Sequence, residues 1–471
     1  MNNFISQSLK EIAITNKFFF FFFYILILIS FAIKLPPIVI LGGMISLMSI
    51  HVFLFPSDFL YFPFIIYPFR FLIRVSDIDS IFLSLLPEAI TIISLIFFLV
   101  NISLPRNIIK VSKTIFYLVT FITLSTLILF IHGIYYESMY FLAVLRTYIL
   151  PFAFTLAVIN FSRLNNFFPN SALTLYMIST SIIALICLLQ YFNFYHLPNN
   201  DLMFYRTHIA GGFDDRALYE SERSIGTFIL PRLNLLSGGS LGSSAGFFFA
   251  IGILWQTSLF KTRKLLRILL SCMCILSSLL TLSFSILNTL LIFGLIYFLV
   301  GNKGKYSLFS SVFSKILLFL LFLPLFFLIK IGDMTLNEYI ILTYFSSSES
   351  NLSLSTILVG FGIDYFSVNY NIIPENNIGD IGVYKIFFQT GIFSFTFLFF
   401  TFYYLIREAL YKISLGYSQI KYTYLYIILL ILVFVHQNWM IGSPFYLLFS
   451  ASVAGIYSCD LEKKQISTFK R

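Results

Sequence analysis

Many of the charged residues of this chain gather in one segment, residues 193–238, which lies between two apolar stretches. The segment holds two histidines, four arginines and five carboxylates, although the whole chain is only 11% charged. Arginine presents a planar set of donors that suits phosphate, and a nearby carboxylate or histidine could accept a proton from an attacking hydroxyl. Such a density of charge beside apolar segments indicates a functional site. The alternative is a solvated loop with ordinary surface ion pairs.

The candidate residues fall into proton acceptors and anion-binding arginines. The predicted catalytic candidates are Asp214, Asp215, Glu222, Asp380 and His436. The predicted substrate-binding residues are Arg146, Arg206, Arg216, Arg223 and Arg232. The residue types alone do not rank the five proton acceptors.

Three of these candidates lie outside the charged segment. Arg146 stands inside the apolar stretch YFLAVLRTYILPF, where an arginine is a functional candidate or else extends to the lipid headgroups. Asp380 lies where an apolar stretch begins, so it could cap that helix as well as face a cavity. His436 lies near Trp439 at a predicted helix end, and its alternative role is an interfacial anchor.

The elements that must position these residues are membrane helices. The 471 residues are 59% hydrophobic, with a mean hydropathy of +0.93, whereas a soluble domain would carry about a quarter charged residues. Apolar runs that could cross a bilayer recur along the chain, and in lipid such runs must be helical to satisfy their backbone hydrogen bonds. We therefore predict an all-α polytopic membrane protein with about 12–14 transmembrane helices, forming a single membrane domain over residues 1–471.

The basic residues predict the orientation of these helices. They cluster between apolar runs, and the positive-inside rule places such clusters in the cytoplasm. With the N-terminus inside, all basic clusters fall inside, and two large loops, 193–238 and 331–380, fall outside. The span 57–73 is the weakest, and an interfacial or re-entrant segment is its alternative. The predicted spans are 18–33, 35–55, 57–73, 79–100, 114–132, 141–161, 171–192, 239–258, 268–283, 285–300, 316–330, 381–405, 422–437 and 443–458.

No motif predicts a metal, nucleotide or other cofactor. Zinc-ligand spacing, a phosphate-binding loop and a nucleophile elbow are all missing from the sequence. The glycine-bracketed turn Gly360-Phe-Gly362 lacks the third glycine of a dinucleotide fingerprint. None of the four cysteines lies in a predicted outer loop, so no disulfide framework is expected. The net charge of +10 follows from membrane topology, and no nucleic-acid partner is predicted.

Three segments carry a resemblance: RSIGTF from Arg223, Ser283-Phe-Ser285, and LVGFGIDYF followed by GDIGVYKIFFQTGIF. Together they resemble the O-antigen polymerase and O-antigen ligase superfamily. RSIGTF, which begins at Arg223, is similar to the Arg-x-x-Gly-Thr-Phe segment that closes a large periplasmic loop in that superfamily. Ser283-Phe-Ser285 resembles its Leu-Ser-x-Ser joint between two short helices. LVGFGIDYF, followed by GDIGVYKIFFQTGIF, resembles the polymerase pattern of a glycine turn before a span. The second outer loop departs from the polymerases because it lacks their arginines, and Asp380 stands roughly where ligases carry a histidine.

The resemblance implies a polymerase in the inner membrane of a bacterium. Such an enzyme transfers a glycan from undecaprenyl diphosphate to a new lipid-linked repeat unit, and the lipid diphosphate is its own leaving group. Arg146, Arg223 and the other loop arginines would hold the diphosphate, and one proton acceptor would activate the attacking hydroxyl. The implied partners are the lipid-linked glycan, membrane lipid and, as further candidates, the flippase and the chain-length regulator.

Two alternatives stay open besides the polymerase. A lipid-linked oligosaccharide flippase would place charged residues along a cavity within its spans, and an O-antigen ligase would transfer the finished chain. A membrane scaffold without catalysis is a third reading, but it would give no role to Arg146.

Overall fold

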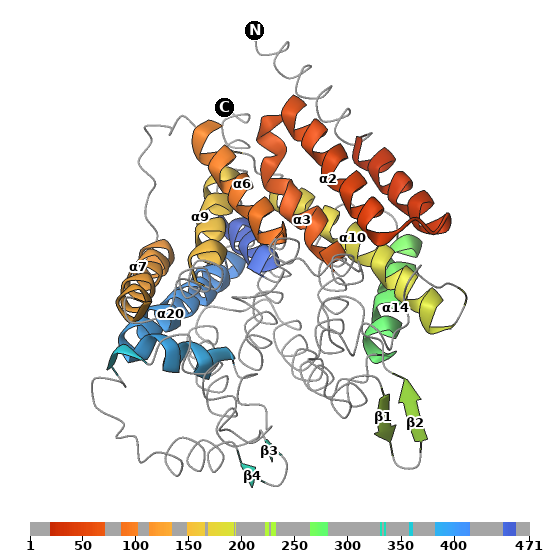
Figure 1. The fold of residues 1–471 in the computed structure, drawn as a ribbon. Coiled ribbons are helices and arrows are strands. Elements are labelled where there is room, and N and C mark those ends of the chain that lie inside the picture. The colour runs from red at the N-terminus through yellow and green to blue at the C-terminus, as the bar shows by residue number, and fades with distance from the viewer. Residues whose placement is uncertain are drawn as a thin grey trace. The chain divides into compact units, whose positions relative to one another are not determined.

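In the computed structural model, most of the described residues are helical (Figure 1). The described residues are 19–70, 86–101, 113–133, 148–164, 168–192, 194, 222–225, 228–231, 264–280, 330–331, 334–335, 358–360, 382–414 and 446–457. The long helices are α2 (Pro37–Leu54), α6 (Leu86–Asn101), α7 (Lys113–Gly133), α9 (Leu150–Leu164), α10 (Phe168–Tyr191), α14 (Lys264–Leu280) and α20 (Gly382–Ser414). Two further helices are Phe19–Ala32 and Tyr446–Tyr457.

Short strands accompany these helices. Strand β1 (Glu222–Ile225) pairs antiparallel with β2 (Phe228–Pro231), and β3 (Lys330–Ile331) pairs with β4 (Met334–Thr335). The predicted outer loop 193–238 therefore contains a hairpin, whose strands are joined by the two residues 226–227. The predominance of helix agrees with the helical class expected from the sequence.

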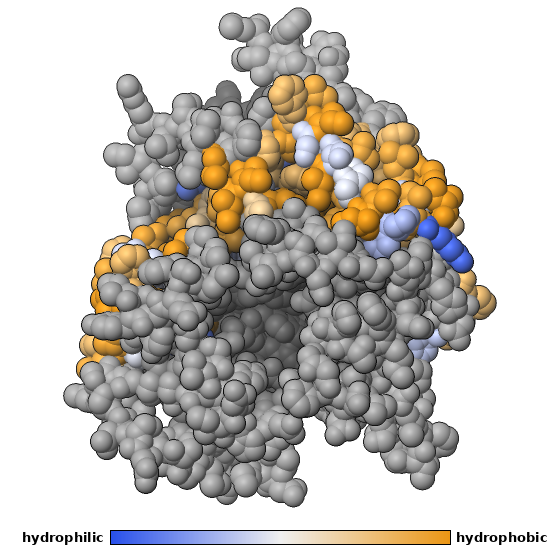
Figure 2. All heavy atoms as spheres, in the orientation of Figure 1, coloured by the Kyte–Doolittle hydropathy of each residue, from blue (hydrophilic) through white to orange (hydrophobic). Residues whose placement is uncertain are grey.

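Four of the described helices are long and apolar enough to cross a membrane, namely Pro37–Leu54, Lys113–Ile131, Phe168–Leu189 and Gln389–Lys412. Each lies within or close to a predicted span. Their outward surfaces are apolar: Phe53 of α2 is 86% exposed, and Figure 2 shows hydrophobic side chains over much of the visible surface of α2. Such surfaces are compatible with a membrane protein. The predicted spans 239–258, 285–300 and 422–437 lie outside the described residues, and of the span 316–330 only Lys330, in strand β3, is described.

Prolines begin several of these helices. Pro37, Pro87, Pro151 and Pro169 each occupy the first or second position of their helix, where a missing backbone N–H removes no helical hydrogen bond. Residues 56–70 have three prolines and break into short pieces: η1 (Pro56–Tyr61), α3 (Phe62–Ile66) and η2 (Tyr67–Arg70). The apolar helical stretch described there, Asp58–Phe69, is shorter than the span predicted over 57–73.

Contacts divide the chain into two compact units. The first unit comprises Met1–Leu104 with Ser171–Phe284, and the second comprises Pro105–Asn170 with Ser285–Arg471. The single membrane domain stays a prediction, because a chain with two such clusters of contacts can still form one membrane body.

The first unit is built on a helical hairpin. Helix Phe19–Ala32 is capped at its C-terminal end by Lys34, whose φ of 57° is left-handed. The Lys34 N–H donates to the Phe31 carbonyl, and the Leu35 N–H donates to the Ser30 carbonyl. This is the hydrogen-bond pattern of a Schellman cap, and α2 starts directly after it at Pro37. The two helices therefore run antiparallel.

Helix α10 of the same unit runs parallel to Phe19–Ala32. The Tyr24 hydroxyl donates to the Leu175 carbonyl at 2.8 Å and lies 2.9 Å from the Ser179 hydroxyl. One helical turn before Tyr24, the Phe20 ring contacts the Tyr61 ring. Tyr61 in turn interacts with Ser171, which lies near the start of α10. Contacts further along one helix therefore lie further along the other, so the two helices are parallel.

The second unit is centred on α20. Tyr117, near the start of α7, stacks on Tyr404, near the end of α20, with ring centroids 5.1 Å apart. Further along α7, Ser125 hydrogen-bonds to Ser394, which comes earlier in α20. The two helices are therefore antiparallel.

The C-terminal helix Tyr446–Tyr457 runs parallel to α20. Its residue Phe449 contacts Phe402, and the Ile456 carbonyl accepts a hydrogen bond from Lys412 further along α20. These contacts advance along both helices in the same sense. The core of the unit lies between these helices and α9, and it includes the fully buried rings of Phe121 and Phe154.

Candidate functional site

Helix α20 is interrupted near its start. Gly391 has φ 73° and ψ 172°, a backbone conformation that is essentially restricted to glycine, so Gly382–Thr390 and the rest of α20 are two helical pieces. The helical residues Leu358 and Val359, and the turn that Gly360 makes after them with φ 85°, lie against this break. A Cβ atom on Gly360 would lie 2.6 Å from the Gln389 carbonyl carbon, and one on Gly391 would collide with the backbone of Leu358. The two glycines therefore permit direct backbone contact between the turn and the broken helix.

A buried hydrogen bond lies beside the break. The Tyr148 hydroxyl donates to Gln389 Oε1 at 2.5 Å, and both side chains are almost completely buried. The Thr390 hydroxyl donates to the Ile386 carbonyl at 2.8 Å, which satisfies one of the carbonyls near the end of the first piece. The Tyr148 bond orients the Gln389 carboxamide and joins α20 to the segment that leads into α9.

The described groups at the break are neutral. A tyrosine hydroxyl and a carboxamide can hydrogen-bond to a sugar hydroxyl or a phosphate oxygen. They do not take up a proton near neutral pH, so any general base has to come from another part of the chain. The arrangement is suited to orienting a polar ligand beside the break in an apolar helix.

Two predicted site residues are close to this break in the sequence. Arg146 comes two residues before Tyr148, and Asp380 comes two residues before Gly382, where α20 begins. Both lie outside the described residues, so their roles stay predictions. The other site residues outside the described part are Arg206, Asp214, Asp215, Arg216, Arg232 and His436.

Glu222 and Arg223 are placed by their backbone alone. In the β1–β2 hairpin Glu222 is opposite Pro231 and Arg223 is opposite Leu230. The hairpin gives the RSIGTF segment a fixed local register, although the chain around it lies outside the described residues. A role for either side chain stays a prediction.

A second polar pair, His51 and Asp58, is buried in the first unit. His51 Nε2 lies 2.9 Å from Asp58 Oδ2, and His51 is only 1% exposed. The imidazole also stacks on the Phe19 ring at 4.1 Å and lies 5.0 Å from the Phe55 ring. The pair joins the last turn of α2 to η1 and is enclosed by aromatic rings.

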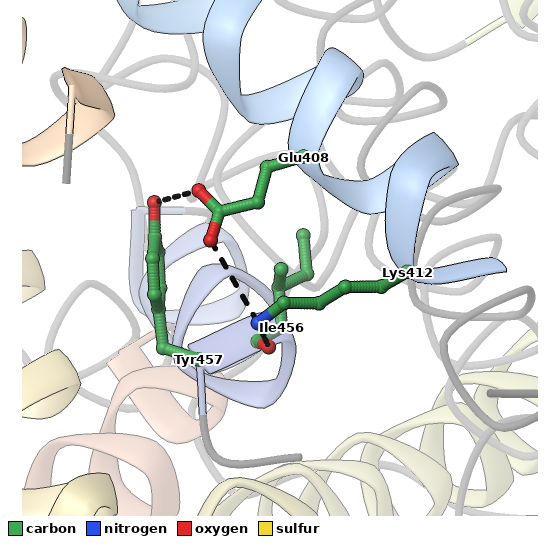
Figure 3. Close-up of polar contacts among 4 residues, drawn as sticks. All are labelled: Glu408, Lys412, Ile456 and Tyr457. Carbon is green, nitrogen blue, oxygen red and sulfur yellow. Dashed lines mark hydrogen bonds and ion pairs between the residues drawn. The ribbon is translucent and has the colours of Figure 1, made fainter. Parts of the chain in front are cut away.

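A third polar cluster joins α20 to the C-terminal helix (Figure 3). The buried Lys412 ammonium donates to the Ile456 carbonyl at 2.6 Å and lies 3.7 Å from Glu408 Oε1. The Tyr457 hydroxyl donates to the other Glu408 oxygen at 2.8 Å. Because the charges and hydrogen-bonding groups of the cluster are paired with one another, it stabilises the packing of α20 against the C-terminal helix.

Gln389, Tyr148 and the His51–Asp58 pair were not among the predicted site residues. A glutamine two residues before a glycine inside an apolar run was a usable signal, since both residues are unfavourable to an uninterrupted lipid-facing helix. His51 and Asp58, on either side of Pro56, gave a weaker one. In the described part of the chain, no three His, Cys, Asp or Glu side chains come together in a way that could hold a metal ion.

The function of the site has to be inferred from its residues and their geometry. No protein-family model matches the chain, and neither a curated protein nor a solved structure matches it.

Proposed function

We propose that this chain is an inner-membrane glycosyltransferase of the O-antigen polymerase type. It extends a surface polysaccharide by joining lipid-linked repeat units on the outer side of the cytoplasmic membrane. The observation that carries the proposal is the buried Tyr148–Gln389 hydrogen bond beside the break in α20. It joins the segment after Arg146 to the helix that follows Asp380, so an arginine and a carboxylate candidate lead into one polar site.

The relative directions of the helices support an outer position for this site. The basic clusters require the segment 114–132 to run outward and the segments 381–405 and 443–458 to run inward. The contacts give α7 a direction opposite to that of α20, and give the C-terminal helix the same direction as α20. With Lys412 and its neighbouring basic residues inside, the break at Gly391 lies toward the outside.

The proposed reaction needs an anion site and a base. The acceptor hydroxyl oxygen attacks the anomeric carbon of the growing glycan, the bond from that carbon to the diphosphate oxygen breaks, and undecaprenyl diphosphate leaves. Arg146 stabilises the departing negative charge, and Asp380 takes the hydroxyl proton. Gln389 and Tyr148 supply no charge. Their role is therefore to orient polar groups of the substrate through hydrogen bonds.

A lipid-linked oligosaccharide flippase is the second candidate. Charged side chains within the helices are typical of transporters, and His51, Asp58 and Lys412 are buried in this chain. All three have partners within the protein, however, and Lys412 follows the break at Gly391 by 21 residues along α20 (412 − 391). The polymerase therefore accounts for more of the site.

The glycan profile of a deletion strain separates the two candidates. Loss of long chains with single-repeat glycan retained supports the polymerase. Loss of all surface glycan contradicts it and indicates the flippase or the ligase. Complementation with the wild-type gene is the control.

Variants in the same strain test the site itself. Gln389→Ala and Arg146→Ala should abolish long chains while the protein remains in the membrane, and Arg146→Lys should restore them only in part, because lysine lacks the planar donor pair. Thr396→Ala is a matched control, since Thr396 lies on the exposed side of α20 and bonds only locally to Ile392 in the structure. Normal chain lengths in both alanine variants would refute this assignment.

A further inference from the structure

Helices α7 and α20 share a face of aromatic and basic side chains at one end. The Tyr117 and Tyr404 rings are nearly parallel, with centroids 5.1 Å apart and an angle of 9° between their planes. The Lys113 ammonium lies 5.5 Å from the centre of the Tyr404 ring, within the range of a cation–π contact. The stack therefore holds the exposed Lys113 against the surface of α20.

The same face continues along α20. Phe400 packs on Tyr117 at 5.3 Å, and Arg407 and Tyr411 follow at helical spacing from Tyr404. Arg407 is exposed, and Tyr411 is 62% exposed. The result is a surface on which Lys113 contacts the Tyr404 ring and Arg407 lies about one helical turn further along α20. We call it the α7–α20 basic face: Lys113, Tyr117, Tyr404, Arg407 and Tyr411.

The position of this face along the helices matches a lipid headgroup layer. The apolar span of α7 begins at Lys113, so the residues that follow Lys113 in α7 enter the bilayer core and Lys113 lies at its boundary. From Tyr404, α20 continues to Ser414, a further rise of about 15 Å, which carries it through the headgroup region. Aromatic and basic side chains at this depth are typical of a membrane interface.

The charge on the face is not balanced by its neighbours on α20. Glu408 is the acidic residue next to Arg407, but its carboxylate is engaged by Lys412 and by the Tyr457 hydroxyl (Figure 3). The first turn of α7 carries no acidic residue, and the positive end of the helix dipole adds to the charge of Lys113. An anion at this surface would therefore be stabilised from both helices.

We propose that the α7–α20 basic face binds the phosphate of an anionic phospholipid such as phosphatidylglycerol. The Lys113 ammonium and the Arg407 guanidinium contact the phosphate oxygens, the tyrosine hydroxyls contact the glycerol, and the acyl chains lie along the exposed Phe116 and Phe400 rings. Only the crossing of the membrane by α7 and α20 is required. The inference therefore survives if the polymerase function is wrong.

The test is lipid binding by the purified full chain in detergent. Native mass spectrometry with added phosphatidylglycerol should show retained lipid, and phosphatidylcholine of the same acyl composition should be retained more weakly. Removing both charges in Lys113→Gln/Arg407→Gln should weaken phosphatidylglycerol binding by about 25-fold, at roughly fivefold per charge. The control Lys303→Gln/Lys305→Gln removes the same charge from another basic cluster and should bind as the wild type does.

A charge-preserving variant keeps the test decisive. Lys113→Arg/Arg407→Lys should retain the preference for phosphatidylglycerol, which shows that loss in the glutamine variant comes from charge and not from misfolding. Equal retention of the two lipids by the wild type, or equal losses in the two glutamine variants, would overturn the assignment. Polymer length in cells is a separate readout, so failure of the lipid site and failure of the proposed function are distinguishable.

Discussion

The break in α20 makes a sharp prediction about Gly391. An alanine there would need a φ of 73° with a ψ of 172°, which costs an L-residue about 1–3 kcal/mol. Its methyl group would also lie 2.6 Å from the Val359 carbonyl carbon, and a real contact of this kind must relax by moving the turn away. Overpacking adds about 1–3 kcal/mol, so Gly391→Ala should destabilise the protein by about 2–6 kcal/mol.

The chain supplies a control for this substitution. Gly43 is a helical residue of α2, and a Cβ built on it meets nothing within 4 Å. Gly43→Ala changes the same atoms, yet it should be neutral or stabilising by about 0.5–1 kcal/mol because alanine favours the helix. The two variants differ only in the backbone conformation and in the room around the added methyl group.

Thermal unfolding of the purified protein in detergent measures both variants. Gly391→Ala should lower the midpoint clearly, and Gly43→Ala should leave it unchanged or raise it. In cells, Gly391→Ala should also shorten the polysaccharide, because displacing the turn disturbs the Gln389 carboxamide. Equal midpoints for the two variants would mean that the turn does not touch the helix as described, and the site would lose its structural basis.

Three further predictions follow from the first unit and from the topology. His51→Leu and Asp58→Asn should each destabilise the protein by about 3–5 kcal/mol, because each leaves a buried partner unmatched. In thermal unfolding, the double variant should lose less stability than the two single variants lose together, and additive losses would contradict the pairing. Lys34→Gly should stabilise by about 1 kcal/mol in the same measurement, because glycine adopts the left-handed cap without strain, and a lower midpoint would count against the cap. In a cysteine-free background, a cysteine at Asn200 should react with an impermeant thiol reagent in intact cells and one at Lys264 should not; the reverse pattern would invert the topology and move the site to the cytoplasm.

Much of the helical layout could be predicted from the sequence. The apolar runs located the described helices to within a few residues in most cases, because a helix that can enter lipid needs a long apolar stretch and ends where polar residues begin. Pro37, Pro87, Pro151 and Pro169 mark helix starts that can be found by reading the chain. The relative directions of α7 and α20 also agree with the basic clusters, since charge at helix ends is a local property of the sequence.

The sequence predicted the candidate site less well. Gln389 and Tyr148 are far apart in the chain, and only tertiary packing brings them within hydrogen-bond distance. The contact between Gly360 and Gly391 depends in the same way on how the turn lies against α20. Residues 57–73 are apolar enough in composition for a span, whereas Pro63 and Pro68 lie where the described part, 57–70, divides into short helical pieces.

The buried charges of the described helices help to locate the ligand by elimination. Glu408 and Lys412 contact each other and Tyr457, and His51 lies against Asp58, so these charges are matched within the protein and require no substrate. A diphosphate needs positive charge that is available to it. The neutral pair at the α20 break cannot provide that charge, although it can hold a sugar in place. The proposed reaction therefore depends on arginines that lead into or face this break, and Arg146 is the one that the chain brings next to it in sequence.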